Sequence, residues 1–227
     1  MCDASKIHPQ GPSPHAGETP AAVLKVKGLS CQRGVRLLFD KLDFELRAGH
    51  ALVVVGRNGA GKSSLLRIVA GLLAATSGRV CLCEGATERP HTEEMHYLGH
   101  DDALKGALSV AENLSFWRAM LGATGVPVAD ALDEVGLGGL ERLPVAVLSA
   151  GQKRRLAIAR LLVSRRRIWI LDEPTTALDV NAQARFAELG RAHLDSGGAI
   201  LAATHAPLDF GPRVGTLQLG AKREVLA

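Results

Sequence analysis

The chain has 227 residues, of which 47% are hydrophobic, and a formal net charge of +4 from 27 basic against 23 acidic residues. This length suits one large or two small packed units, and the mild basic excess neither requires nor excludes nucleic acid or an anionic membrane as a partner. Its longest uncharged apolar runs fall well short of the roughly 18 residues of a membrane-spanning helix. We therefore expect any link to a membrane to go through a partner protein.

Residues 1–20, "MCDASKIHPQGPSPHAGETP", are polar and rich in glycine and proline. Such composition predicts a disordered tail, and the lack of an apolar leader fits a protein that stays in the cytoplasm. Cysteines further along are expected to be free thiols, as in a reducing compartment. A metal site built from Cys81, Cys83 and nearby histidines is conceivable, but no C-x-x-C pair or helical histidine pair supports it.

In chain order, residues 22–56 predict short strands separated by glycine-containing turns, and residues 62–73 predict an amphipathic helix. Residues 101–143 are mostly helix-forming but broken by glycine and proline. The rest of the chain alternates: helix at 148–167, buried strand at 168–174, helix at 180–196 and strand at 198–205. This alternation predicts an α/β protein with a largely parallel sheet.

The stretch "VVVGRNGAGKSSLLRI" places a glycine-rich loop between an apolar strand and a helix, and it fits the pattern G-x-x-x-x-G-K-[ST]. Glycines let successive backbone N–H groups converge on phosphate oxygens at a helix N-terminus. Lys62 would reach the β- and γ-phosphates, and the Ser63 hydroxyl would bind Mg²⁺. A glycine-rich turn with a surface lysine is the alternative, and the strand–loop–helix context disfavours it. The predicted phosphate-binding residues are Gly56, Arg57, Asn58, Gly59, Ala60, Gly61, Lys62, Ser63 and Ser64.

The strand in "RIWILDEP" ends in two carboxylates, Asp172 and Glu173. Ligands bind at the carboxyl ends of parallel strands, so Asp172 is placed to hold Mg²⁺ through water. Glu173 is placed to orient or deprotonate an attacking water. The alternative is an ordinary surface pair that ends a strand. Trp169 is interpreted as a core residue and not as a platform for a nucleobase.

Between these motifs lies "VLSAGQKRRLAIARLL", and "WILDEPTTALD" follows directly. Together with the phosphate loop, these segments resemble the ATP-binding-cassette family over nearly everything after residue 20. The resemblance implies a phosphate-loop NTPase core of cassette type with an antiparallel β subdomain. It also implies one cassette over 21–227, with an inserted helical subdomain at about 101–160.

The family resemblance also implies ATP and Mg²⁺ as cofactors and a head-to-tail homodimer. In such a dimer, Ser149, Gly151 and Gln152 of one copy would lie against the γ-phosphate bound by Lys62 of the other. A serine at this position can cap the following helix and present its N-terminus to the phosphate.

Catalytic residues implied by the resemblance are Glu173, Lys62 and His205, the last as the histidine that contacts the γ-phosphate and water. The segment 176–179 resembles the loop that joins two cassettes.

Two family positions are occupied differently here. Where an aromatic residue usually stacks on adenine, "LSCQRGVRLLF" offers Arg33 or Val35. Where a glutamine usually reaches Mg²⁺, "HYLGHDDALKG" offers His100 or Asp101.

Together with "YLGHDDALKGALSVAENLSFW" and "ATHAPLDF", these segments resemble the cytochrome c maturation branch of the family. That branch implies an ATP-hydrolysing, haem-transporting type of translocase subunit, peripheral on the cytoplasmic side of the cell inner membrane. The implied partners are a CcmB-type permease and CcmC, CcmD and CcmE proteins, with ATP hydrolysis serving haem export or release of the haem-loaded chaperone.

Two other functions stay open: the ATPase of another small-substrate exporter, and a soluble cassette ATPase acting on nucleic acid or ribosomes. The chain lacks the paired cassettes or long coiled-coil insertion usual in the soluble class, so no nucleic-acid partner is expected. Candidate residues for the groove that receives the permease are Phe116, Trp117, Met120 and Leu121, unless they pack within the helical subdomain.

Overall fold

A computed structural model of the chain describes residues 22–82, 91–205 and 208–220. The predicted tail and Cys83 lie outside the described residues. Cys31 is buried and Cys81 is half-buried, and both are free thiols, as expected. Among the described residues no group of three or more His, Cys, Asp or Glu side chains could hold a metal ion. No helix in the described ranges is long and apolar enough to cross a membrane.

The centre of the molecule is a five-stranded sheet in which all neighbouring strands are parallel, as predicted. In spatial order its strands are β5 (Met95–Leu98), β6 (Ile168–Asp172), β7 (Ala199–Ala203), β3 (Ala51–Val55) and β8 (Val214–Gln218). Every residue of β6 and β7 is buried, which is typical of parallel strands covered on both faces. Alternate side chains of these strands enter two separate hydrophobic clusters.

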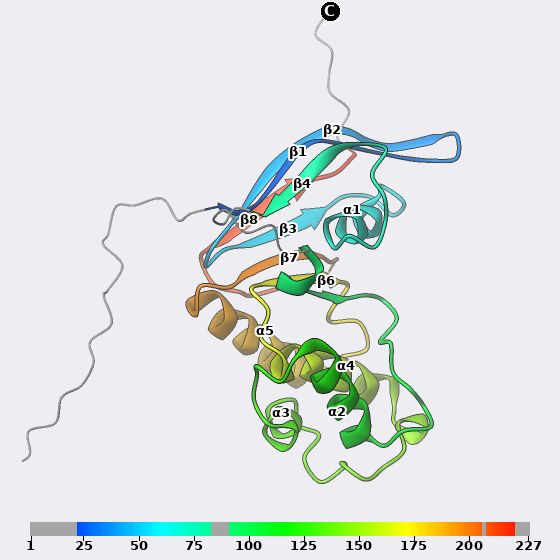
Figure 1. The fold of residues 1–227 in the computed structure, drawn as a ribbon, viewed down its shortest axis with the longest axis vertical. Helices are drawn as coiled ribbons and strands as arrows, with labels where there is room; N and C mark the ends of the chain where they lie inside the picture. The colour runs from blue at the N-terminus through cyan, green and yellow to red at the C-terminus, as the bar shows by residue number, and fades with distance from the viewer. Residues whose placement is uncertain (1–21, 83–90, 206–207, 221–227) are drawn as a thin grey trace, which may run out of the picture.

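One face of this sheet is covered by an antiparallel sheet and a helix (Figure 1). The antiparallel sheet has the order β2 (Arg36–Arg47), β1 (Ala22–Arg33) and β4 (Ser77–Leu82). Helix α1 (Lys62–Val69) is shorter than predicted. It ends because Gly71 adopts a left-handed conformation and the Gly71 and Leu72 N–H groups turn back to the carbonyls of Ile68 and Arg67. Leu72 is consequently exposed.

The opposite face is covered by helices that occupy the lower part of Figure 1. They are α2 (Val110–Leu121), α3 (Val128–Glu134), α4 (Ala150–Val163) and α5 (Val180–Asp195), with short 3₁₀ turns at His91–Glu94 and Val145–Val147. Helix α4 is shorter than the predicted 148–167, because Ser164 is already extended and leads into β6. The buried cluster runs without interruption from α2 and α4 to the sheet, so a separate helical subdomain at about 101–160 stays a prediction.

Candidate nucleotide-binding site

The phosphate loop joins β3 to α1, in the context that the sequence predicts. Gly61, at the N-cap of α1, has a φ of 100°, and a Cβ atom there would lie 3.0 Å from the Leu38 Cβ atom. At Gly56 a Cβ atom would lie 2.6 Å from the Leu219 carbonyl oxygen. Both positions therefore require glycine. No side chain caps α1, which leaves its first N–H groups available to an anion.

Lys62 is a buried cation inside this loop. Its Nζ atom donates to the Gly56 carbonyl oxygen at 2.8 Å and lies 3.3 Å from the His205 Nε2 atom. Only 8% of the residue is exposed, and in the described ranges no carboxylate pairs with it. A buried charge without a counter-ion favours an incoming anion, so the geometry suits a phosphate group.

Ser63 and Asp172 come together from different elements. The Ser63 hydroxyl donates to the Asp172 Oδ1 atom at 3.0 Å, and Asp172 is 3% exposed at the end of β6. Hydroxyl and carboxylate oxygens are the ligands that Mg²⁺ prefers, so these two residues fit a magnesium site completed by phosphate oxygens and water.

Tyr97 belongs to the same site, although the sequence analysis did not identify it. It lies on β5, and its hydroxyl donates to the Asp172 Oδ2 atom at 3.4 Å while accepting from the Arg67 Nε atom at 3.3 Å. Burial raises the pKa of Tyr97, which keeps the hydroxyl protonated as a donor. The pairing of β5 with β6 decides this contact, and that pairing is not visible in the local sequence.

Glu173 has an unusual backbone conformation for its residue type. Its φ is 49°, and a left-handed conformation costs a residue with a Cβ atom about 1–2 kcal/mol. The Glu173 N–H group donates to the Ala203 carbonyl oxygen at 2.8 Å, and the Oε2 atom accepts from the His205 N–H group at 3.3 Å. Positive-φ residues held by their surroundings cluster at functional sites.

The three expected catalytic residues therefore meet at one edge of the sheet. Lys62 follows β3, Glu173 follows β6 and His205 follows β7. The Glu173 Oε1 atom lies 3.6 Å from the His205 Nε2 atom. Because β6, β7 and β3 are neighbours and parallel, their carboxyl ends bring these side chains together.

The expected signature residues lie at the N-terminus of α4. Ser149 is the N-cap: its Oγ atom accepts from the Gln152 N–H group, and the Gln152 Oε1 atom accepts from the Ser149 N–H group at 2.9 Å. The predicted cap is confirmed. Gly151 packs closely on the 176–179 loop, since a Cβ atom there would lie 2.8 Å from the Ala177 carbonyl oxygen.

Within the described residues, no hydrogen bond or ion pair joins Ser149, Gly151 or Gln152 to the phosphate loop. One chain thus contains the two parts of the expected site without a polar contact between them.

Beside the phosphate loop is a groove of about 380 Å³. It is lined by Arg36, Leu37, Leu38, Arg57, Asn58, Gly59, Ala60, Leu219 and Gly220. Neither Arg33 nor Val35, the residues expected to replace the aromatic residue, lines this groove, and Val35 is fully exposed at the β1–β2 turn. Arg36 lies beside the loop: its Nη1 atom would be 3.5 Å from a Cβ atom at Gly59. The base contact at Arg33 or Val35 thus stays a prediction, and Arg36, the cross-strand partner of Arg33, is a further candidate.

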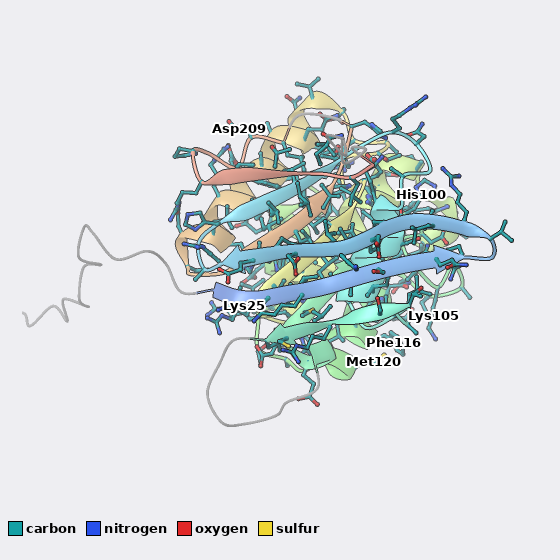
Figure 2. All side chains as sticks on the ribbon, turned by 90° about the horizontal axis from the view of Figure 1, so that it is seen from above. Lys25, His100, Lys105, Phe116, Met120 and Asp209 are labelled. Atoms are coloured by element: carbon teal, nitrogen blue, oxygen red, sulfur yellow. The ribbon has the colours of Figure 1, made fainter. Side chains whose placement is uncertain are left out.

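Neither candidate for the glutamine position makes a side-chain hydrogen bond in the part of the chain that the structure describes. His100 and Asp101 are both exposed, and His100 is labelled in Figure 2. The next residue, Asp102, forms an ion pair of 2.8 Å with the buried Arg154. Arg154 is not predicted from the sequence, since an arginine in a basic helical segment carries no local signal of burial.

Of the candidate groove residues, Phe116 and Trp117 pack on each other edge to face, with ring centroids 5.5 Å apart. The Lys105 Nζ atom lies 4.4 Å from the Phe116 ring centroid, and the Arg160 guanidinium lies 4.6 Å from that of Trp117. Met120 is 64% exposed, on the side of the molecule where Figure 2 shows Phe116 and Lys105. Internal packing therefore holds the two aromatic residues, while Met120 is open. Trp169 is 4% exposed and stacks on His193, which confirms its place in the core.

The sequence matches the ABC transporter family over residues 39–176. The cytochrome c biogenesis ATP-binding export protein CcmA of Rhodopseudomonas palustris (strain BisB5) is 54% identical over 198 residues, which cover 87% of this chain and 98% of that protein. The protein of the same name from Bradyrhizobium diazoefficiens is 56% identical over 183 residues, covering 81% and 92%.

Solved structures agree on the fold. The ATP-binding subunit of an ABC transporter superposes with a TM-score of 0.77 at 22% identity over 88% of each chain. A dimeric ATP-binding cassette in a post-hydrolysis state, bound to ADP and Pi, superposes with a TM-score of 0.74 at 21% identity over 87% of this chain and 96% of that one. The fold is thus the expected cassette, and the chain belongs to the ABC transporter family, in its branch of cytochrome c biogenesis ATP-binding export proteins named CcmA.

Proposed function

We propose that two copies of this chain bind and hydrolyse ATP as the motor of a membrane ABC system for cytochrome c biogenesis. One observation carries the proposal: Lys62, Asp172 and Glu173 converge at the strand ends of a chain that is 54% identical to CcmA over nearly its whole length. ATP binding and hydrolysis follow from membership of this family. The magnesium ligands, the dimer and the membrane partners are parts of the proposal.

In the proposed reaction, the N–H groups of the phosphate loop bind the β- and γ-phosphates, and the Lys62 ammonium turns from the Gly56 carbonyl to them. Ser63 and Asp172 would hold Mg²⁺, which neutralises charge on the phosphate oxygens when bound. Fixed positive groups around the transferred phosphoryl group are expected to supply most of the rate gain.

Glu173 orients a water molecule and accepts its proton as the water oxygen bonds to the γ-phosphorus. The bond from that phosphorus to the bridging oxygen breaks, which yields ADP and inorganic phosphate. The backbone N–H group of His205 donates to the Glu173 carboxylate, so this contact orients the base, and the His205 side chain lies beside Lys62.

The second copy completes the site in this proposal. The Ser149 oxygen already accepts from the Gln152 N–H group, but its own proton is free to donate to a γ-phosphate. Helix α4 adds the partial positive charge of its N-terminus. Since these groups make no polar contact with the phosphate loop of their own chain, a head-to-tail partner is the natural source of the bound phosphate.

Membrane attachment is proposed to go through a permease of CcmB type, with CcmC, CcmD and CcmE proteins as further partners. The chain would then sit peripherally on the cytoplasmic side of the inner membrane and serve haem export or release of a haem-loaded chaperone. The export function in the name of the CcmA relatives supports this assignment, and the open Met120 surface offers a contact for the permease.

The experiment that tests this function replaces Glu173 by glutamine in the native host as the only copy of the gene. We expect haem-stained bands of c-type cytochromes to disappear while b-type cytochromes persist, because the dimer binds ATP and does not turn over. The purified Glu173→Gln protein should hydrolyse ATP about 10²–10³-fold more slowly and form dimers with ATP and not with ADP.

Glu188→Gln, an exposed carboxylate on α5, serves as the matched control and should leave staining and hydrolysis unchanged. Unchanged c-type bands in the Glu173→Gln strain, with the variant expressed and attached to the membrane, would contradict the role in cytochrome c biogenesis. Undiminished hydrolysis would contradict the role of Glu173.

A further inference from the structure

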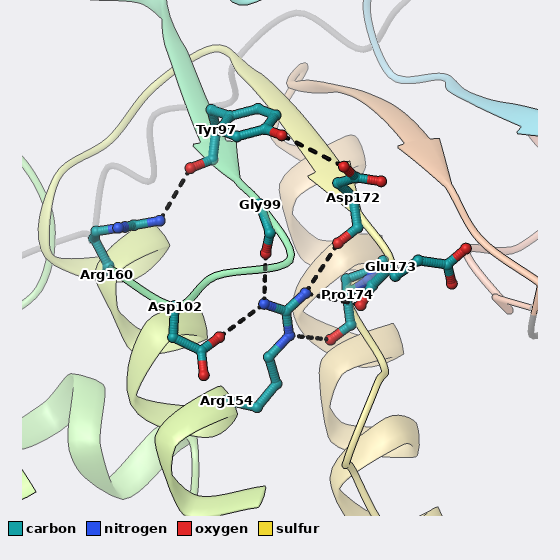
Figure 3. A network of polar contacts seen from close by, with 8 residues as sticks. All are labelled: Tyr97, Gly99, Asp102, Arg154, Arg160, Asp172, Glu173 and Pro174. Carbon is teal, nitrogen blue, oxygen red and sulfur yellow. Dashed lines mark hydrogen bonds and ion pairs between the residues drawn. The ribbon is translucent and has the colours of Figure 1, made fainter. Parts of the chain in front are cut away.

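The side chain of Arg154, on the second turn of α4, connects three parts of the site (Figure 3). We propose that Arg154 is a positioning residue for hydrolysis. It holds the Asp172–Pro174 turn, and with it the Glu173 carboxylate, in a fixed position relative to the N-terminus of α4, where Ser149 lies. This inference rests on the ATP hydrolysis proposed above.

All five N–H groups of the guanidinium have acceptors. The Nη2 atom donates to the Asp172 carbonyl oxygen at 3.1 Å and to that of Glu173 at 2.8 Å, and the Nε atom donates to the Pro174 carbonyl oxygen at 2.9 Å. The Nη1 atom donates to the Gly99 carbonyl oxygen and to the Asp102 Oδ1 atom, both at 2.8 Å. With 4% of the side chain exposed, these bonds are shielded from water.

The contact with Glu173 matters most, because this residue is in the left-handed region. Its N–H group is held by the Ala203 carbonyl oxygen and its carbonyl oxygen by Arg154. These two bonds fix the peptide planes on both sides of the Glu173 Cα atom, and so the direction in which the carboxylate leaves the backbone. Without Arg154 the turn can relax, which would move the carboxylate away from His205 and from the attacking water.

The remaining contacts extend the connection to the segment that follows β5. Gly99 and Asp102 flank His100 and Asp101, whose side chains make no hydrogen bond in the described ranges. Arg154 therefore ties this segment to the catalytic turn through the backbone and through Asp102. Because Ser149 begins the same helix, a movement of α4 when its N-terminus meets a second copy would act on both segments together.

The planar guanidinium is essential to this arrangement. Five donors in a rigid fork reach acceptors on two segments at once, whereas a lysine ammonium offers three donors around a single atom. Arg154→Lys should therefore hold the catalytic turn only in part. Arg154→Met, which keeps much of the side-chain volume, should not hold it at all.

Arg155→Met is the matched control. Arg155 is the next residue on α4, but its Nη1 atom donates to the Gly136 carbonyl oxygen at 2.7 Å, away from the catalytic turn. For all three variants we would measure the melting temperature, Kd for ATP, kcat and KM. Each variant is also combined with Glu173→Gln, and ATP-dependent dimer formation is measured in these double variants. Kinetics are run well below each melting temperature.

For Arg154→Met we expect kcat to fall about 100-fold with KM and Kd for ATP changed less than about threefold, since the phosphate loop is intact and the carboxylate is misplaced. Arg154→Lys should lose about 10-fold, and Arg155→Met should match the wild type in kcat. Dimer formation should weaken in the Arg154 variants and not in the control.

A folded Arg154→Met protein with wild-type kcat would overturn the inference, as would a loss of ATP affinity equal to the loss of kcat. If Arg154→Met does not fold, the same two results measured on Arg154→Lys, a wild-type kcat or a loss of ATP affinity equal to the loss of kcat, would overturn the inference. A wild-type chain without ATP hydrolysis or ATP-dependent dimers would instead overturn the proposed function, and this inference with it.

Discussion

Two regions of the expected site are built differently within one chain. At the strand ends, Lys62, Asp172 and His205 already contact other residues of the site. At the start of α4, Ser149 and Gln152 bond to each other and complete only the cap of their own helix. The first region thus has its expected residues in mutual contact, whereas the second makes no hydrogen bond to the phosphate loop within the described residues.

Control of hydrolysis in the proposed dimer would follow from this contrast. The expected catalytic residues follow adjacent parallel strands, so their geometry is part of the fold. The expected signature residues lie at the start of α4, and Gly151 packs against the 176–179 loop of the same chain. In the proposed dimer, hydrolysis would depend on how two chains meet, and Arg154 connects α4 to the Asp172–Pro174 turn inside each chain.

The largest expected effect is complementation between two inactive variants, one altered in each region. Lys62→Ala removes the phosphate ligand, and Ser149→Asp keeps the helix cap but places a carboxylate against the γ-phosphate. Each alone should lose ATP hydrolysis by about 10²-fold or more. An equimolar mixture should regain measurable activity, because a mixed dimer contains one site with Lys62 from one chain and Ser149 from the other.

The double variant Lys62→Ala/Ser149→Asp is the control, since it can restore no site when mixed with either single variant. A steady-state phosphate-release assay of all mixtures at constant total protein makes the comparison. If the Lys62→Ala and Ser149→Asp mixture gives no more than the sum of its parts, the proposed head-to-tail site is wrong.

Acid should weaken a contact between β5 and the C-terminal end of α4, on the side of the sheet away from both regions. His96 on β5 is 3% exposed, its Nε2 atom lies 2.6 Å from the Ser164 carbonyl oxygen at the end of α4, and burial lowers its pKa to about 3. Burial also lowers the pKa of His193 to about 4. Both would have a pKa near 6.5 in the unfolded chain, which therefore binds more protons than the folded one below that pH.

The free energy of unfolding should thus decrease as the pH falls below about 6.5. Protonation of His96 in the unfolded chain alone should lower it by up to about 2 kcal/mol at pH 5. Chemical denaturation at pH 7 and pH 5 measures this loss. His96→Gln should show a smaller loss than the wild type, and the exposed His100→Gln should show the same loss. An unchanged pH dependence in His96→Gln would rule out His96 as a source of acid sensitivity.

The smallest expected effect is on the affinity for the adenine base of ATP, beside the strand-end region. Arg36 lines the groove beside Gly59, and a guanidinium on an aromatic base is worth about 0.5–1 kcal/mol at an exposed site. Arg36→Ala should raise Kd for ATP about two- to fivefold and leave Kd for inorganic triphosphate unchanged. Competition against a fluorescent nucleotide measures both constants.

Arg33→Ala provides the contrast, because Arg33 is one of the two candidates, with Val35, for the usual aromatic position and does not line the groove. We expect its Kd values to match the wild type. If Arg33→Ala raises Kd for ATP more than Arg36→Ala does, Arg33 and not Arg36 contacts the base.

Much of this fold could be predicted from local sequence. The run "AILAA" is apolar at every position, and "IWILD" is apolar up to its last residue, Asp172; parallel strands buried on both faces need that composition. The glycines of the phosphate loop were predictable because they fit the pattern G-x-x-x-x-G-K-[ST] between an apolar strand and a helix. Ser149 and Gln152 carried their own signal, a capping box three residues apart.

Helix ends were less predictable. The hydrophobic spacing continues to Leu72, but the left-handed Gly71 stops α1 at Val69. The motif comparison also offered Arg33 or Val35 for the base contact, whereas the groove beside the phosphate loop is lined by Arg36, the cross-strand partner of Arg33.

The sequence by itself therefore determined the phosphate loop, the carboxylates at the end of β6 and the alternation of strands and helices. These features depend on neighbours within a few residues, where glycine conformation, capping and hydrophobic period act directly. Only the tertiary structure brought Tyr97 to Asp172, Arg36 to the loop and Arg154 to the Glu173 backbone. Those contacts join segments 19 to 75 residues apart, and strand order and packing decide them.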